Sequence, residues 1–337
     1  MLVCKDSQIL DAELSNLTDF LQEGDVLVFN DARVIKAKLS AKILRNSAKL
    51  DFNLDQPLDD GLRPLLGDLN NNIWNALCRP AKKVKIDDDL EIAPDFFAKV
   101  LEKTDNGFIK IKFDCTDEEL RTKLDKYGCV PLPPYIKRPL DDGLRPLLGD
   151  RESDQKNYQT IYAANGTAVA APTAGLHFNE NIFSLLEAKK IKKAFVTLNV
   201  GAGTFLPVRS DFLKDHKMHQ ESFSVSKEAV EIINSAKENG KKIIAVGTTS
   251  LRVLESIADE NNRVQPTESS TQIFIFPPYK FKIVDILMTN FHLPKSTLFM
   301  LICAFVGKEK AFEVYNHAIS NHYRFYSYGD SSLLFKN

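Results

Sequence analysis

The chain has 337 residues, of which 44% are hydrophobic and 26% are charged. These proportions are those of an ordinary soluble globular protein, and they exclude a disordered chain, a collagen and a coiled coil. Because 44 lysines and arginines nearly balance 45 aspartates and glutamates, the chain lacks a general positive charge, so any RNA-binding surface must be local.

The length, the cysteines and the apolar runs together indicate a cytoplasmic protein. At about 150 residues per domain, the chain is long enough for roughly two domains with sizeable cores. Its 5 cysteines are scattered without the spacing of a zinc site or a disulfide framework, so we expect reduced thiols. The longest apolar run, residues 298–307, is about half of the roughly 20 residues that cross a bilayer. Residues 1–10 do not resemble a signal peptide either, so we expect no membrane span.

One sequence, PLDDGLRPLLGD, occurs twice, at residues 57–68 and 139–150. A chance identity of this length has odds on the order of one in a billion, so the segment was copied. The flanking sequences are unlike each other, which argues against a repeat fold. Proline, glycine and acidic residues suit a solvated turn, so we interpret both copies as inserted surface loops.

The first part of the chain predicts a short α/β segment followed by a small all-β domain. A helix over residues 14–22 precedes a turn and the apolar strand VLVFN at residues 26–30. Short alternating runs over residues 37–112 are typical of a small barrel or sandwich. A helix over residues 117–127 follows, and the prolines of CVPLPPYIKRP predict a stiff, extended linker at a domain hinge.

From residue 158 the pattern changes to strands that alternate with helices, which is typical of an α/β domain with a largely parallel sheet. We expect strands at AVAAPTAG, AFVTLNVG, KKIIAVG, TQIFIF and DILMTNF, and helices from Asn179, near 227–239, from Thr248, at 296–305 and at 309–320. The sequence therefore predicts an α/β domain of residues 1–36 and 139–337, interrupted by a β domain of residues 37–138.

Two turns in the second half have the composition of ligand-binding loops. In IIAVGTTSLRVLES, a strand leads to Thr248, Thr249 and Ser250, which are suited to cap a helix. The N–H groups of such a helix end bind a carboxylate or phosphate, although an ordinary capped helix has the same pattern. AFVTLNVGAGTF contains Gly201 and Gly203 but lacks the third glycine of a dinucleotide-binding loop. These glycines permit close approach of a planar or sugar ligand, or they form only a tight turn.

Histidines mark candidate positions for proton transfer. His177 in APTAGLHFNE can carry a proton near neutral pH, since its reference pKa is about 6.5, although a lone histidine is often structural. His216, His219, Glu221 and His292 are of metal-binding types, but the HExxH motif is absent, so we expect no metal site. The sequence also lacks the serine-hydrolase and P-loop motifs.

Basic residues beside aromatic rings are the candidate RNA contacts. Lys137 and Arg138 can neutralise phosphates, and Tyr135 can stack on an exposed base. The alternative interpretation is ordinary solvated charge, and it applies equally to the lysine clusters elsewhere in the chain.

Taken together, the motifs resemble those of one enzyme family, the S-adenosylmethionine:tRNA ribosyltransferase-isomerases of queuosine biosynthesis. The resemblance extends from about residue 24 to residue 330. It rests on VFNDARVIKAKL, PLPPYIKRP, YQTIYA, VAAPTAGLHF, VTLNVGAGTF, MHQE, IIAVGTTSLRVLES, DILMTNFHLPKSTLFMLICAF and YRFYSYGD. It implies an α/β domain interrupted by a β-barrel, in agreement with the change of pattern along the chain.

The resemblance also implies a reaction. The ribosyl group of S-adenosylmethionine is transferred to the aminomethyl-deazaguanine base of tRNA and isomerised, giving epoxyqueuosine-tRNA with release of adenine and methionine. S-adenosylmethionine is then a substrate, and neither a cofactor nor a metal is required. We expect a monomeric enzyme in the cytoplasm.

This chemistry assigns hypothetical roles to the motif residues. A base must take the proton from the carbon beside the sulfonium, and adenine must be hydrogen-bonded as it leaves. His177 is the acid/base candidate, with His219 and Glu221 as the alternative pair. The expected contacts are Thr248, Thr249 and Ser250 for the methionine carboxylate, Gly201, Gly203 and Thr204 for the nucleoside, Asn290, His292, Lys295, Tyr328 and Asp330 for the rest of the cleft, and Tyr135, Lys137 and Arg138 for tRNA.

Two departures from the family leave other functions open. The chain is expected to begin inside the family's first structural unit, and the second PLDDGLRPLLGD copy adjoins the expected RNA surface. An inactive, tRNA-binding relative of the enzyme is therefore one alternative, and only the active enzyme releases adenine. A methyltransferase that uses S-adenosylmethionine is another alternative, which the missing glycine disfavours and which a methylated product would indicate.

Overall fold

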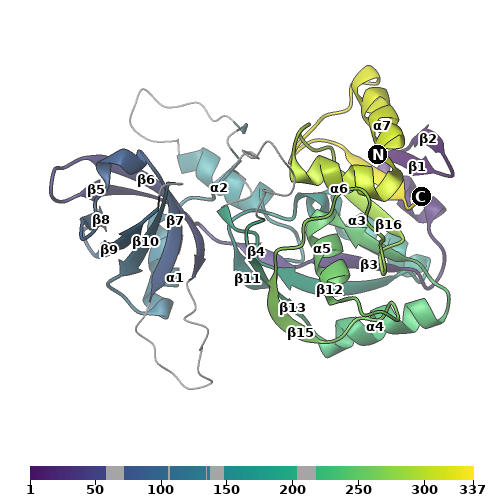
Figure 1. Cartoon of the computed structure of the whole chain (residues 1–337), viewed down its shortest axis with the longest axis horizontal. Helices are drawn as coiled ribbons and strands as arrows, with labels where there is room; N and C mark the ends of the chain where they lie inside the picture. Colours follow the sequence, from purple (N-terminus) through teal and green to yellow (C-terminus); the bar gives the residue numbers. More distant parts are fainter. Residues whose placement is uncertain (58–71, 105–106, 134, 137–147, 203–217) are drawn as a thin grey trace.

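A barrel and a larger sheet lie side by side in the computed structural model of the chain (Figure 1). The structure describes residues 1–57, 72–104, 107–133, 135–136, 148–202 and 218–337. Four of the expected contacts lie outside these ranges, namely Gly203, Thr204, Lys137 and Arg138. Most of both PLDDGLRPLLGD copies also lies outside the described residues.

The barrel is built from strands whose side chains alternate between its interior and its surface. Within the described residues it closes in the order β10-β7-β6-β5-β8-β9. In β5, KLSAKI, every second residue is buried, as a strand with one face on a core requires. The strands are β5 (Lys38–Ile43), β6 (Lys49–Pro57), β7 (Ile73–Arg79), β8 (Asp89–Ala93), β9 (Phe96–Lys103) and β10 (Phe108–Phe113). Helix α1 (Asp117–Tyr127) follows, so the expected all-β unit and its following helix are confirmed.

The larger sheet is parallel in its centre, and its outer pairs are antiparallel except for β17 with β1, which is parallel. Among the described residues its order is β15-β13-β12-β3-β14-β16-β17-β1-β2, and the central strands β12, β3, β14 and β16 are parallel. The strands are β1 (Leu2–Lys5), β2 (Gln8–Asp11), β3 (Val26–Asn30), β12 (Lys192–Leu198), β13 (Glu221–Val225), β14 (Ile243–Val246), β15 (Thr267–Thr271), β16 (Ile286–Asn290) and β17 (Ser331–Phe335). The short strands β4 (Ala32–Val34) and β11 (Asn165–Ala168) form a separate two-stranded sheet. The predicted fold class, an α/β sheet interrupted by a small barrel, is confirmed.

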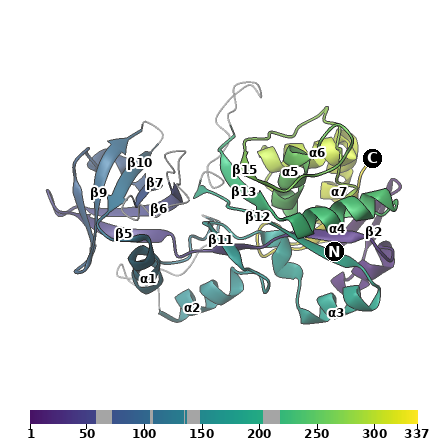
Figure 2. The ribbon, with the colours of Figure 1, turned by 90° about the horizontal axis from the view of Figure 1, so that it is seen from below.

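Helices cover both faces of this sheet, as Figure 2 shows. Because neighbouring residues of a strand face opposite sides, Val26 and Val28 of β3 join one core, and Leu27 and Phe29 join the other. The first core contains α4 (Lys227–Glu238), α5 (Gly247–Ile257), α6 (Thr297–Val306) and α7 (Lys308–Ser320). The second contains α3 (Glu180–Ala188) and the 3-10 helix η1 (Leu14–Phe20). In the described part of the chain, no helix is both long and apolar enough to span a membrane.

Several sequence expectations need correction. The helix expected at residues 14–22 is the 3-10 helix η1, and AVAAPTAG contributes only its start to β11 before the 3-10 helix η3 (Thr173–His177). TQIFIF is not a strand, because the polar segment before it pairs with β13 and the side chain of Ile275 turns into the core. The second PLDDGLRPLLGD copy is not a loop throughout, since its last residues begin helix α2 (Leu148–Asn157).

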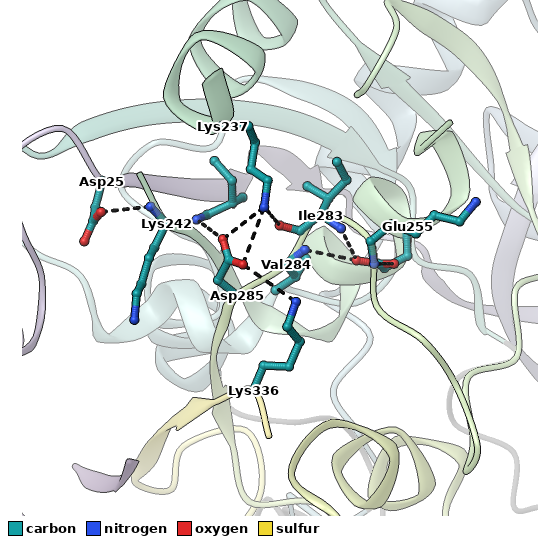
Figure 3. A network of polar contacts seen from close by, with 10 residues as sticks. Asp25, Lys237, Lys242, Glu255, Ile283, Val284, Asp285 and Lys336 are labelled. Atoms are coloured by element: carbon teal, nitrogen blue, oxygen red, sulfur yellow. Dashed lines mark hydrogen bonds and ion pairs between the residues drawn. The ribbon is translucent and has the colours of Figure 1, made fainter. Parts of the chain in front are cut away.

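Carboxylate side chains accept hydrogen bonds from backbone N–H groups at the amino ends of the parallel strands (Figure 3). Asp25 Oδ1 accepts the backbone N–H of Lys242, and Asp285 Oδ2 accepts that of Ile243, both at 2.9 Å. Lys237 also forms an ion pair with Asp285 at 3.4 Å. These groups satisfy backbone donors between strands, so this edge has a structural role.

Glu255 stabilises the turn before β16, and its replacement by Gln is expected to lower the free energy of unfolding by about 2–3 kcal/mol. Its two carboxylate oxygens accept the backbone N–H groups of Lys282, Ile283 and Val284 at 2.9–3.0 Å (Figure 3). The side-chain amide of glutamine has only one oxygen that can accept these N–H groups. Its NH₂ group would face at least one backbone N–H, which would then lack an acceptor. Urea unfolding measures the loss, with Glu268→Gln at an exposed position of β15 as the control. Equal unfolding midpoints for both variants would contradict this role of Glu255.

Candidate active site

The carboxyl ends of the parallel strands form the opposite edge of the sheet. The strands β3, β12, β14 and β16 end at Asn30, Leu198, Val246 and Asn290, and their parallel pairing brings these ends together. Ligands of open α/β sheets bind outside this edge, where loops leave the strands. Most of the expected site residues that the structure describes follow one of these ends.

Asn290 joins residues from separate segments into one cluster at this edge. It is 3% exposed, and its Oδ1 accepts the hydroxyl of Thr173 at 3.1 Å. Its Nδ2 donates to the carbonyl of Tyr326 at 3.1 Å and to that of Ser327 at 3.5 Å, and it lies 3.2 Å from Nε2 of His177. These residues, Thr173, His177, Asn290, Tyr326 and Ser327, are called the Asn290 cluster below.

The hydrogen bonds of Asn290 define the tautomer of His177. Carbonyl oxygens only accept hydrogen bonds, so the amide nitrogen of Asn290 must face Tyr326 and Ser327. The His177 Nε2 beside that nitrogen is then an acceptor, which leaves the hydrogen of the neutral ring on Nδ1. His177 therefore offers a hydrogen-bond donor at Nδ1.

The charge of His177 differs from the sequence expectation. Burial lowers the pKa of its ring to about 4, against which the nearby carboxylate of Asp330 acts only in part. The ring is therefore neutral at pH 7, with its single hydrogen on Nδ1, and does not take up the second proton that the sequence expectation allowed. Residue 175 of η3 must be glycine for η3, and with it His177, to pack in this position. A Cβ on Gly175 would lie 1.9 Å from the hydroxyl oxygen of Tyr162.

His292 and Lys295 follow the same strand but have different surroundings. Nε2 of His292 lies 3.0 Å from the hydroxyl of Thr289, its backbone N–H donates to Tyr315, and burial lowers its pKa to about 4. Lys295 is exposed just before α6. The hydrogen bonds described for these two residues do not connect them with the Asn290 cluster.

The free energy of unfolding is expected to fall as the pH decreases from 6.5 towards 4. The unfolded chain binds protons on His177 and His292 near pH 6.5, whereas both folded rings have a pKa of about 4. The unfolded state therefore binds more protons in this interval, and each ring lowers stability by about 2–3 kcal/mol at pH 4. Above about pH 7 both rings are neutral in the folded and in the unfolded chain, so they no longer lower the stability.

Denaturant titrations at pH 7 and pH 4 measure this dependence, with His292→Gln as the comparison. The variant lacks one of the two titrating rings, so its stability is expected to fall by about 2–3 kcal/mol less between these pH values. The same fall in both proteins would contradict the buried, neutral state of His292.

A second group of expected residues lies where the sheet meets the barrel. Gly201 is buried after β12, and the next backbone N–H, that of Ala202, donates to Asp55 of the barrel strand β6. The exposed His219 has its ring centroid 6.0 Å from that of Phe108 in β10. These contacts make the barrel one wall of the candidate site.

Glu221, at the start of β13, is 6% exposed and is paired with Arg252 of α5. Its carboxylate therefore holds a guanidinium group, which does not suit the expected role as a base. Arg252 was not among the expected site residues, although it stands in the motif IIAVGTTSLRVLES. A charged residue directly between the apolar Leu251 and Val253 was the signal in the sequence that could have found it.

Helix α5 begins earlier than expected. Its N-cap is Val246, so Thr248, Thr249 and Ser250 lie in the first turn and do not cap it. The positive φ of Gly247, 90°, allows the sharp turn from strand to helix. The hydroxyl of Ser250 is fully buried and donates to the carbonyl of Val246. The Oγ1 of Thr249 is buried and has no hydrogen-bond partner among the described residues.

The linker between barrel and sheet reaches the Asn290 cluster. The hydroxyl of Tyr135 lies 2.7 Å from that of Ser327, and its ring centroid is 4.8 Å from that of Tyr326. The expected site residues of this C-terminal motif were Tyr328 and Asp330, whereas the contact is made by Tyr326 and Ser327.

Tyr328 and Asp330 border the cluster. The ring of Tyr328 lies 6.1 Å from that of Tyr158, and Asp330 forms an ion pair with Arg324 at 2.9 Å. Burial alone would raise the pKa of Asp330, but the hydrogen bonds from Arg324 together lower it. Asp330 is therefore ionised at pH 7. Within the described ranges, no group of three or more His, Cys, Asp or Glu residues is arranged to hold a metal ion.

Comparison with known proteins identifies the family. Residues 1–334 match the family described as queuosine biosynthesis protein. Proteins named S-adenosylmethionine:tRNA ribosyltransferase-isomerase from Rickettsia bellii and Allorhizobium ampelinum are 45% and 46% identical over 340 residues, which is 100% of this chain and 92% and 91% of theirs. A crystal structure of S-adenosylmethionine tRNA ribosyltransferase from Thermotoga maritima is 31% identical, with 99% of this chain and 91% of that chain covered and a TM-score of 0.49. The chain belongs to the queuosine biosynthesis protein family.

Proposed function

We propose that the chain transfers and isomerises the ribosyl group of S-adenosylmethionine onto the aminomethyl-deazaguanine base of tRNA. The products are epoxyqueuosine-tRNA, adenine and methionine, so S-adenosylmethionine is consumed as a substrate. The observation that carries this proposal is the identity of 45% over the whole chain to enzymes with this name. The polar Asn290 cluster at the carboxyl edge of the sheet supports it. The proposed setting is the cytoplasm, with the enzyme acting as a monomer.

The geometry favours a donor role for His177 in this reaction. Its Nε2 is occupied by Asn290, its ring is neutral at pH 7, and its Nδ1 carries the hydrogen. A neutral donor of this kind hydrogen-bonds a nitrogen of adenine as negative charge develops on the leaving base. Among the three acid/base candidates, His219 at the barrel junction is then the remaining base, because Glu221 is paired with Arg252.

The other described residues have proposed roles in binding. Gly201 lets the backbone approach the nucleoside, and the first turn of α5, with Thr248 and Thr249, offers N–H and hydroxyl groups to the methionine portion. Asp330 and Tyr328 border the ribosyl group beside the Asn290 cluster. Ser250 is not assigned a direct contact, because its hydroxyl is buried and already donates to the carbonyl of Val246.

The tRNA is proposed to bind along the linker between barrel and sheet, where Tyr135 is exposed beside the Asn290 cluster. Tyr135→Ala is expected to raise the KM for tRNA about 10-fold, because an aromatic ring stacked on a base contributes roughly 1–3 kcal/mol. Tyr135→Phe keeps the ring and is expected to lose much less.

Steady-state kinetics with tRNA as the varied substrate measure this difference, and the KM for S-adenosylmethionine is the internal control. Affinity for tRNA is also expected to fall steeply with salt. Equal losses for the Phe and Ala variants would show that the hydroxyl contact with Ser327, and not stacking, is what matters.

Mass spectrometry of the products tests the proposed function. The protein is incubated with S-adenosylmethionine and with tRNA that carries or lacks the aminomethyl-deazaguanine base. We expect adenine release that depends on the modified tRNA, with a matching gain in nucleoside mass. Binding of tRNA without adenine release would overturn the proposal in favour of an inactive relative, and a methyl gain would indicate a methyltransferase.

A further inference from the structure

Arg252 has a buried guanidinium group, of which one edge, Nε and Nη2, has no partner among the described residues. The residue is 6% exposed and lies in α5 opposite the start of β13, where Nη1 donates to Oε2 of Glu221. Among the residues that the structure describes, Nε and Nη2 have no hydrogen-bond partner. A buried cationic donor without a partner is costly, so this edge is suited to receive an anion.

Arg45 in the barrel shows what this edge binds when it is occupied. Its Nε donates to Oδ1 of Asp88 at 2.6 Å, and its Nη2 donates to Oδ2 at 3.1 Å. The two parallel N–H groups thus match the two oxygens of one carboxylate. In Arg252 the same pair of nitrogens is available, at a site that is far less exposed than the 41% of the Arg45 side chain.

The pairing of β12 with β13 places this edge in the candidate active site. Leu198 is opposite Phe223, and the N–H of Asn199 donates to the carbonyl of Ser222. Continued by one residue, this register places Glu221 opposite Val200, just before Gly201. The ion pair of Glu221 and Arg252 therefore lies at the carboxyl edge of the sheet, beside the wall formed by the barrel.

A second unpartnered donor lies one turn earlier on the same helix. Thr249 precedes Arg252 by three residues. Residues with this spacing are neighbours on the surface of a helix, and their Cβ atoms are about 5–6 Å apart. Its Oγ1 is also buried without a partner among the described residues. A hydroxyl and a two-nitrogen fork together suit a small planar anion.

We propose that the Nε and Nη2 edge of Arg252 binds the carboxylate of the methionine portion of S-adenosylmethionine, with Thr249 as an additional donor. This proposal rests on the proposed function. The 8% exposure of the Arg252 side chain favours a carboxylate of a small molecule over a phosphate of tRNA, because a nucleic-acid backbone cannot enter so enclosed a place. Glu221 is a positioning residue that fixes the plane of the guanidinium group.

Decarboxylated S-adenosylmethionine, which lacks only this carboxylate, is the probe. For the wild-type protein, kcat/KM is expected to be roughly 100-fold lower with the decarboxylated compound, since two charge-assisted hydrogen bonds are lost. Arg252→Gln is expected to lose about the same factor with S-adenosylmethionine, mainly through KM, and to lose little more with the decarboxylated compound. The matched control Arg45→Gln is expected to keep the wild-type preference.

The contrary outcomes are distinct. Equal loss with both compounds in Arg252→Gln would show a purely structural role, and a rise only in the KM for tRNA would show a phosphate site; either would overturn the proposal. Equal use of both compounds by the wild-type protein would overturn it without any variant. If no protein turns over either compound, the proposed function fails, and calorimetric binding of the two compounds to wild type and Arg252→Gln still decides the carboxylate site.

Discussion

His177→Ala is expected to lower kcat/KM by on the order of 100-fold to 1000-fold, whereas His177→Asn is expected to stay within about 10-fold of wild type. The alanine variant removes the Nδ1 donor at the carboxyl edge of the sheet. The amide nitrogen of asparagine lies close to the position of Nδ1, so it can replace a neutral donor. It cannot replace a base or an imidazolium.

His177→Gln is the matched variant. Its amide reaches the position of Nε2, which already accepts from Asn290, and leaves the Nδ1 position empty. Glutamine is therefore expected to behave like alanine in single-turnover assays of adenine release. Asparagine and alanine variants of equal activity, together with an acidic limb near pH 6.5 in the wild-type profile, would contradict the neutral-donor role and favour a base.

Asn290→Ala is expected to lower kcat about 100-fold and the free energy of unfolding by about 2–4 kcal/mol. The change leaves the hydroxyl of Thr173, Nε2 of His177 and the carbonyls of Tyr326 and Ser327 without their common partner. His177 is then free to rotate or to exchange its tautomer, so the loss is expected in kcat. The effect on stability and the effect on catalysis can be separated by a control.

Asn234→Ala is that control. Asn234 is also buried and uses both ends of its amide, with Nδ2 donating to the carbonyl of Val264 and Oδ1 accepting its N–H. It lies in α4, on the face of the sheet that carries the first core, and is not part of the Asn290 cluster. A similar loss of stability with normal kcat is expected. A comparable fall in kcat for Asn234→Ala would show that Asn290 acts only through stability.

The central elements of the fold could be predicted because their signals are local. The apolar residues of β3 and β14, and the capped start of α3 at Asn179, are complete within short windows of sequence. The edge of the sheet depends on pairing with distant strands. The apolar residues of TQIFIF therefore predict a strand there, although Thr267–Thr271 forms the hydrogen bonds with β13. Apolar content cannot distinguish a buried coil from a strand.

The sequence motifs predicted which residues belong to the candidate site, but not the hydrogen bonds or the protonation states of these residues. His177 and Asn290 were both selected, yet their hydrogen bond, the neutral charge of the ring and the part played by Tyr326 come from segments that are distant in sequence. Burial decides the pKa of His177, and burial is a property of the folded chain. The start of α5 at Gly247 is also set by the folded chain. It places Ser250 inside the first turn, where its hydroxyl donates to the carbonyl of Val246 and does not cap the helix.

A crystal structure with S-adenosylmethionine or an unreactive analogue tests the location of the active site most directly. We expect the ligand at the carboxyl edge of the sheet, with its adenine within hydrogen-bond distance of His177 Nδ1 and its carboxylate on Nε and Nη2 of Arg252. A ligand bound elsewhere, on the barrel or at the amino edge beside Asp285 and Glu255, would contradict the proposed site and both assigned roles.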